Sequence, residues 1–204
     1  MFFCCYNRPN NQHKELGMRL TFDLDNVIFN MKPLYQEAFR RAGIAYYKPT
    51  SWDLHKAYHN EKIVNNLLEL FKDDLLYTMP VLDAGIPKLL NELMARPDMD
   101  VLFVTERRLK QPDKTFMQLR NAGIKCAFNQ VYDQEGQKPD ILSCLKPDMH
   151  FDDGPLVVAG CLEKHVPITM ISNNNTLYNH YLRPMVTYHK CLRNALAKYN
   201  INHR

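Results

Sequence analysis

The second half of the chain alternates between two apolar patterns. Short apolar runs typical of buried strands occur at 101–104, 127–132, 148–151 and 167–172, and segments of helical spacing occur at 111–123, 138–145, 154–165 and 187–199. Strands that alternate with helices indicate βαβ units and a parallel sheet. We therefore predict an α/β protein with a doubly wound parallel sheet, whose last strand is 167–172 and whose last element is an amphipathic helix.

The first half begins with one strand-like run and then becomes helical. The run at 19–28 predicts the first strand, and helical spacing recurs at 33–44, 61–77 and 85–96. We predict a helical insertion over 31–96, and a core built from 18–30 and 97–204. Residues 1–17 are expected to be an extension outside the fold, either mobile or an upstream start that folding does not need.

Polar residues stand where the predicted strands end. Two aspartates one residue apart interrupt the apolar run RLTFDLDNVIF, although a buried charge is costly unless something compensates it. Ligands of open parallel sheets bind beyond the carboxyl ends of the strands. We expect six residues at this edge: Asp23 and Asp25 after the first strand, Thr105 after the second, Lys138 after the third, and Asp152 and Asp153 after the fourth.

This set of side chains matches phosphoryl transfer through an aspartyl-phosphate. Asp23 would attack phosphorus as a nucleophile. Asp25 would protonate the leaving alcohol and then deprotonate the attacking water. A hard cation, Mg²⁺, would offset the clustered negative charge and polarise the phosphate. Thr105 and Lys138 would bind the phosphate oxygens.

Four stretches in this order, RLTFDLDNVIF, VLFVT, QKPD and HFDDGPLVV, resemble the four motifs of the haloacid dehalogenase (HAD) superfamily of phosphohydrolases. The resemblance covers most of residues 18–172 and implies a HAD-like fold with a Rossmann-like core. FDDGPLVV followed by VPITMI and TLYNHYL is similar to the branch that contains the 5′(3′)-deoxyribonucleotidases and their bacterial and phage relatives.

The resemblance also implies a role for each residue of the set. Asp23 would be nucleophile and metal ligand, and Asp25 would be the acid/base and would contact the metal through its backbone carbonyl. The pair Asp152 and Asp153 would complete the Mg²⁺ site, and which of the two touches the metal stays open. Residues 31–96 occupy the position of the family's cap, a domain that closes over the site and selects the substrate.

Two features depart from the deoxyribonucleotidase pattern. Thr105 is followed by Glu-Arg-Arg rather than by small residues, and a solvated loop is the favoured interpretation of Arg107 and Arg108. The cap aromatics Tyr46, Tyr47 and Trp52 do not align with a known base-stacking pair, and core packing is their favoured role. Both features bear on the substrate and not on the phosphatase chemistry.

Composition narrows the class of protein. The formal charge of +4 is spread over 204 residues, so a nucleic acid is not an expected partner. No apolar run reaches the ~18 residues of a membrane span. Six cysteines without a CxxC pair favour a reducing, cytoplasmic setting. The chain has no GxxxxGK[ST] and no GxGxxG motif. The order of the acidic, Thr and Lys residues also excludes a response-regulator receiver domain.

We therefore predict a Mg²⁺-dependent phosphomonoester hydrolase whose partner is a small phosphorylated substrate. A 5′-(deoxy)nucleotide is the leading substrate. A sugar phosphate or another small metabolite is one alternative. A HAD-like protein that binds a phosphorylated ligand without turnover is another, and the oligomeric state stays open.

Overall fold

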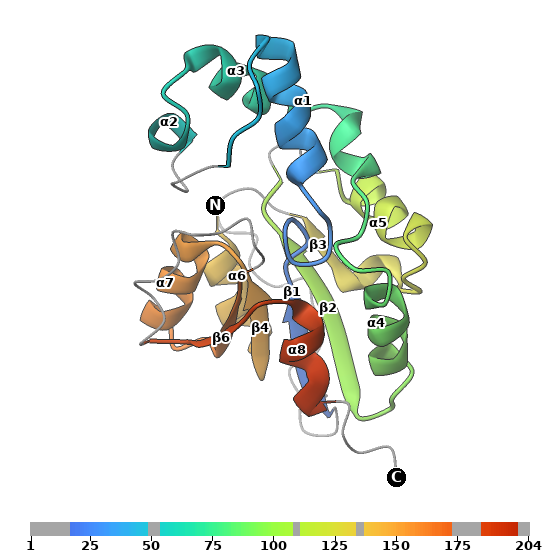
Figure 1. The fold of residues 1–204 in the computed structure, drawn as a ribbon. Coiled ribbons are helices and arrows are strands. Elements are labelled where there is room, and N and C mark those ends of the chain that lie inside the picture. The colour runs from blue at the N-terminus through green and yellow to red at the C-terminus, as the bar shows by residue number, and fades with distance from the viewer. Residues whose placement is uncertain (1–16, 49–53, 108–110, 134–136, 173–184, 200–204) are drawn as a thin grey trace.

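The computed structural model describes residues 17–48, 54–107, 111–133, 137–172 and 185–199 (Figure 1). Four features of the sequence analysis lie outside these residues: most of the predicted extension, Trp52, Arg108 and the stretch TLYNHYL at 176–182.

The described residues form a six-stranded sheet in the order β3-β2-β1-β4-β5-β6, and every pair of neighbours is parallel. The strands are β1 (Met18–Phe22), β2 (Met99–Thr105), β3 (Val131–Asp133), β4 (Met149–Asp152), β5 (Ile168–Ile171) and β6 (Thr187–His189). From β1 the chain adds β2 and β3 on one side of this strand and then β4, β5 and β6 on the other. The carboxyl end of β1 is therefore the topological switch point of the sheet. The predicted doubly wound α/β fold is confirmed.

Helices cover both faces of the sheet (Figure 1). On one face, α6 and α7 pack through an apolar cluster that includes Val104, Leu142 and Val158. On the other face, α4 packs against β2 and α8, and a larger apolar cluster extends from there into the helical insertion. The core helices are α4 (Ile86–Met94), α5 (Pro112–Asn121), α6 (Lys138–Leu145), α7 (Pro155–Glu163) and α8 (Leu192–Leu196), and short 3-10 helices are η3 (Phe128–Gln130) and η5 (Ala197–Tyr199).

The insertion after β1 is helical and packs around its own aromatic cluster. It contains α1 (Lys32–Ala42), α2 (Leu54–Ala57), α3 (Glu61–Leu70) and the 3-10 helix η2 (Asp74–Thr78). The ring of Phe39 lies 5.2 Å from that of Tyr46, 4.8 Å from that of Tyr47 and 5.3 Å from that of Tyr58. This agrees with a packing role for Tyr46 and Tyr47. The domain limits stay a prediction, and α4, inside the range 31–96, packs on the sheet rather than on α1 or α3.

The first strand is shorter than predicted. It ends at Phe22, and the following apolar residues form a tight loop in which the Leu24 carbonyl accepts the N–H groups of Ile28 and Phe29, both at 2.8 Å. Asn26 has a left-handed backbone (φ 60°), which no strand residue adopts. The apolar side chains of the loop are buried, so the run reads as a strand although its backbone turns.

The prediction that 167–172 is the last strand is wrong. Thr187–His189 adds β6 to the edge of the sheet, with Thr187 beside Thr169 and Tyr188 beside Met170. The final helix therefore begins at Leu192, after an extended Cys191. A three-residue edge strand is too short to show an alternating pattern, and its β-branched and aromatic residues are equally compatible with the helix stripe predicted there.

Candidate active site

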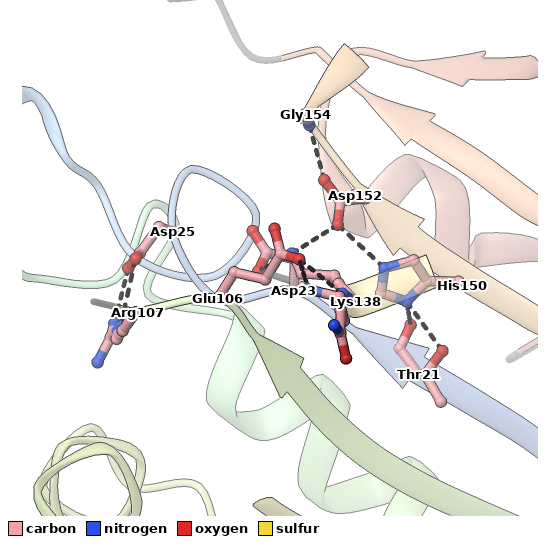
Figure 2. Close-up of polar contacts among 10 residues, drawn as sticks. Thr21, Asp23, Asp25, Glu106, Arg107, Lys138, His150, Asp152 and Gly154 are labelled. Carbon is pink, nitrogen blue, oxygen red and sulfur yellow. Dashed lines mark hydrogen bonds and ion pairs between the residues drawn. The ribbon is translucent and has the colours of Figure 1, made fainter. Parts of the chain in front are cut away.

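Asp23 is placed by β1 at the centre of the sheet edge. The register pairs Phe22 with Phe103 on one side and with Phe151 on the other, so the residues that follow these strands emerge at the same level. The Asp23 backbone N–H donates to the Phe151 carbonyl at 2.9 Å. The side chain of Asp23 is buried, and it points toward the group of polar residues in Figure 2.

Lys138 brings two of the carboxylates together. Its Nζ lies 2.7 Å from Asp23 Oδ1 and 2.8 Å from Asp152 Oδ2, and the whole residue is buried. Burial disfavours the ammonium, but Asp152 and Asp23 raise the pKa of Lys138 above its ordinary value, so it stays charged. Glu106 fixes the start of α6, because its Oε1 accepts the backbone N–H groups of Gln137 (2.9 Å) and Lys138 (2.6 Å).

A buried histidine holds Asp152 from the opposite side. His150 Nε2 lies 3.0 Å from Asp152 Oδ2, and Nδ1 lies 2.9 Å from Thr21 Oγ1. Burial keeps the pKa of His150 below its ordinary value. Because a carboxylate only accepts, the neutral ring donates from Nε2 to Asp152, and Nδ1 faces both the hydroxyl of Thr21 and its carbonyl oxygen, the latter at 3.1 Å. Gly154 N–H donates to Asp152 Oδ1 at 2.7 Å. Both Asp152 oxygens are thereby fixed (Figure 2).

Asp23, Asp152 and Asp153 form a compact acidic cluster whose ligand oxygens lie within 4.8 Å of one another. Burial raises the pKa of Asp23 to about 7, with Lys138 opposing and Asp152 adding to the rise. Burial and the charge of Asp23 raise the pKa of Asp153. Burial also opposes ionisation of Asp152, but Lys138 and His150 hold its pKa below its usual range. One lysine does not neutralise three buried carboxylates, and this surplus suits a hard divalent cation with oxygen ligands.

Asp25 lies apart from this cluster and pairs with Arg107. The guanidinium forms a two-point contact with the carboxylate, with NH2 2.7 Å from Asp25 Oδ1 and Nε 3.2 Å from Asp25 Oδ2. Figure 2 shows the pair separated from the group around Lys138. Arg107 is only 2% exposed, so the solvated-loop interpretation of this arginine is wrong.

All six predicted site residues line or adjoin one cavity of about 280 Å³. Thr105 ends β2 and is buried in the cavity wall beside Glu106. The insertion contributes a largely apolar part of the cavity lining, which consists of Met31, Tyr35, Phe71 and Leu76. The edge of the sheet therefore supplies the charged groups, and the insertion supplies the apolar surface over them.

Sequence reasoning missed three residues that support the site. His150 precedes Asp152 by two positions on β4, so both side chains face the same side of the strand, and that spacing was the available signal. Arg107 lies two residues beyond the end of β2, where strand alternation no longer applies, so it carried no such signal. Glu106 carried no local signal, because its partners are backbone groups of a segment 31 residues away.

Comparisons with known proteins agree with this geometry at the level of the fold. No protein-family model and no curated protein sequence matches the chain. A haloacid dehalogenase-like family hydrolase from Streptococcus pneumoniae matches with a TM-score of 0.63 and 16% identity, over 90% of this chain and 98% of that one. A protein from Bacillus subtilis described as a HAD hydrolase bound to magnesium matches with a TM-score of 0.57 and 14% identity, over 92% of this chain and 100% of that one. A HAD family hydrolase from Deinococcus radiodurans with bound phosphate and sodium matches with a TM-score of 0.57 and 13% identity, over 89% of this chain and 96% of that one. The chain therefore has the fold of the HAD superfamily hydrolases.

Proposed function

We propose that the protein is a Mg²⁺-dependent phosphomonoester hydrolase that works through an aspartyl-phosphate on Asp23. The observation that carries the proposal is the buried cluster of Asp23, Asp152 and Asp153 with Lys138 at the switch point of a HAD fold. The motif resemblance found in the sequence assigns the same residues. A surplus of buried negative charge reduces stability, so its presence is better explained by chemistry than by folding.

The acidic cluster fits a magnesium ion. Asp23, Asp152 and Asp153 would hold the ion, and the motif resemblance adds the Asp25 backbone carbonyl as a further ligand. When bound, it would supply positive charge that offsets the carboxylates and polarises the phosphate. The magnesium in the Bacillus subtilis structure supports this choice of metal.

The residues of the chain divide the reaction between them. An oxygen of Asp23 forms a bond to phosphorus while the bond from phosphorus to the leaving oxygen breaks, and Asp25, which enters this step as the carboxylic acid, gives that oxygen its proton. Asp25 then takes a proton from water as the water attacks the phosphoryl group, which releases inorganic phosphate and restores Asp23. Lys138 favours the ionised form of Asp23, against the effect of burial, and with Thr105 it binds the phosphate oxygens. The phosphate bound in the Deinococcus radiodurans structure is consistent with this use of the fold.

The cavity wall favours a 5′-(deoxy)nucleotide as the substrate. A sugar phosphate would need hydrogen-bond partners for several hydroxyl groups, whereas the cap side of the cavity presents mostly apolar side chains. Tyr35 and Phe71 form an edge-on aromatic pair there, with ring centres 6.5 Å apart, and aromatic faces bind nucleobases by stacking. A sugar phosphate or other small metabolite is the second candidate and keeps the same mechanism.

Phosphate release from nucleoside monophosphates and sugar phosphates, measured with Mg²⁺ and with EDTA, tests the proposal. We expect turnover with Mg²⁺ alone, highest for deoxynucleoside 5′-monophosphates. Equal rates across the panel would discard the nucleotide and retain the mechanism. No release from any ester would contradict the hydrolase and favour a protein that only binds phosphorylated ligands.

The metal-free protein should lose stability as the pH rises from about 4 to about 7. Folding raises the pKa of Asp23 from 3.8 to about 7 and also raises that of Asp153. The folded state then binds more protons than the unfolded chain, so this contribution is complete below the unfolded pKa and is lost as the pH passes the folded one. The lowered pKa of Asp152 acts in the opposite sense, but at lower pH. The lowered pKa of His150 also acts in the opposite sense, up to its ordinary value of 6.5, and we expect the two raised carboxyl pKa values to outweigh this single imidazole.

Magnesium should replace these protons. The rise in melting temperature produced by Mg²⁺ is therefore expected to grow between about pH 5 and about pH 8. Thermal unfolding with EDTA and with Mg²⁺ over this range measures both effects. A Mg²⁺ effect that is the same at every pH would place the ion somewhere other than on Asp23 and Asp153.

No helix among the described residues is long and apolar enough to cross a lipid bilayer.

A further inference from the structure

The Glu-Arg-Arg run after Thr105 departs from the pattern of the deoxyribonucleotidase branch. Its first arginine, Arg107, has no role in the proposed hydrolase mechanism. We propose that Arg107 is a positioning residue that fixes the carboxylate of Asp25 at the cavity wall for proton transfer to the leaving group. This inference rests on the proposed function, because it assigns Arg107 a part in that reaction.

The contact between Arg107 and Asp25 sets both the position and the plane of the carboxylate. The Nε and NH2 groups lie on the two different oxygens of Asp25. A two-point contact of this kind fixes orientation as well as distance. It occupies one lone-pair site on each oxygen, and a carboxylate has about four such sites. The side chain of Asp25 lines the cavity and is 26% exposed, so the remaining sites are accessible to a substrate.

The guanidinium is itself held on its other sides. NH1 donates to Gln118 Oε1 at 2.8 Å and lies 3.4 Å from Thr115 Oγ1 on α5. The ring of Tyr77 lies against the guanidinium, with 5.2 Å from Cζ to the ring centre. Only 1% of the Arg107 side chain is exposed, so the guanidinium cannot turn toward solvent. The group that orients the Asp25 carboxylate is therefore itself fixed.

The same network reaches the cap. Gln118 Nε2 donates to the carbonyl oxygens of Leu76 (3.2 Å) and Met79 (3.5 Å), which belong to the segment that returns from the insertion to the core. Leu76 lines the cavity. Arg107 thus ties Asp25 to α5 and, through Gln118, to the wall of the cavity that the insertion supplies.

Lysine would not replace this arginine. An ammonium is a point charge without the planar fork, so Arg107→Lys keeps the ion pair and loses the fixed plane of the carboxylate. Misplacing a proton donor slows the departure of a poor leaving group and matters little for one that departs as a stable anion. A merely structural role would lower both rates together.

The test compares kcat/KM for two esters, a nucleoside 5′-monophosphate and p-nitrophenyl phosphate, with Mg²⁺. For Arg107→Lys we expect a fall on the order of 10²-fold for the nucleotide, within the range of general acid catalysis, and less than about tenfold for the nitrophenyl ester. The matched control is Arg19→Lys: Arg19 is also buried and pairs with Asp100 at 2.7 Å, but it lies in β1 before the site. The control should change stability without separating the two esters.

An equal fall for both esters in Arg107→Lys would overturn the inference and leave the hydrolase intact. If the wild-type protein hydrolyses neither ester, the proposed function fails, and the inference with it. Should Arg107→Lys not fold, Gln118→Met removes one partner of Arg107 and keeps the arginine. For this variant we expect kcat/KM to fall about tenfold for the nucleotide, a tenth of the fall in Arg107→Lys, and to fall less for the nitrophenyl ester. Equal losses for the two esters would again overturn the inference.

Discussion

Asp23→Asn is expected to abolish turnover and to stabilise the metal-free protein. Without a carboxylate at residue 23 no aspartyl-phosphate forms, and loss of a catalytic nucleophile lowers kcat on the order of 10⁴-fold or more. The neutral amide keeps the shape of the side chain and still accepts the Lys138 Nζ–H. Because folding raises the pKa of Asp23 to about 7, ionising this side chain costs free energy in the folded state, and above that pH the folded protein bears the whole cost. We expect Asp23→Asn to raise the free energy of unfolding by roughly 2 kcal/mol at pH 8 in EDTA.

Two measurements on the same protein check this expectation: phosphate release with Mg²⁺, and thermal unfolding in EDTA at pH 5 and pH 8. Asp100→Asn is the matched control, because Asp100 is a partly buried carboxylate that pairs with Arg19 away from the site. That control should lose stability and keep turnover. Turnover retained by Asp23→Asn would contradict the covalent mechanism. A loss of stability at pH 8 would show that Asp23 serves the fold.

The site was predictable from the sequence wherever strand position alone decides it. Asp23 and Asp152 meet because each directly follows or ends a central strand, and the register of β1 with β4 aligns those strand ends. An alternating pattern of strands and helices is sufficient to place such residues at one edge. Thr105 and Lys138 were found by the same reasoning, and the structure puts them on the same cavity.

The remainder depends on contacts that a one-dimensional pattern does not carry. Arg107 looks like a loop residue because its partners, Asp25 and Gln118, come from two other segments of the chain. The loop after β1 buries its apolar residues as a strand does, so hydrophobicity does not reveal where the backbone turns. In both cases the local sequence is ambiguous and the tertiary contact determines the structure.

Lys138 connects the stability of the site to its chemistry. Among the described residues it is the only cation paired with Asp23 or Asp152, and both contacts are buried. Removing one member of a buried ion pair leaves the other uncompensated, which typically costs about 3–5 kcal/mol. In Lys138→Met we expect a loss of this size in EDTA at pH 8. Turnover with Mg²⁺ should also fall, on the order of 10²-fold or more, because a donor to the phosphate is lost.

Two conditions should restore part of the stability of Lys138→Met, and they separate a charge effect from a packing defect. Lowering the pH toward 5 protonates Asp23 and Asp153, whose pKa values are raised by burial, and Mg²⁺ supplies the missing positive charge. Lys164→Met is the control, since Lys164 is an exposed lysine that pairs with Asp140 at 2.6 Å, and it should leave the free energy of unfolding nearly unchanged at every pH and Mg²⁺ concentration. A packing defect in Lys138→Met would persist at every pH and Mg²⁺ concentration. Recovery under both conditions would instead mean that the carboxylates need a cation. In the free protein Lys138 would then supply that positive charge and keep the carboxylates in place for the metal and the phosphate.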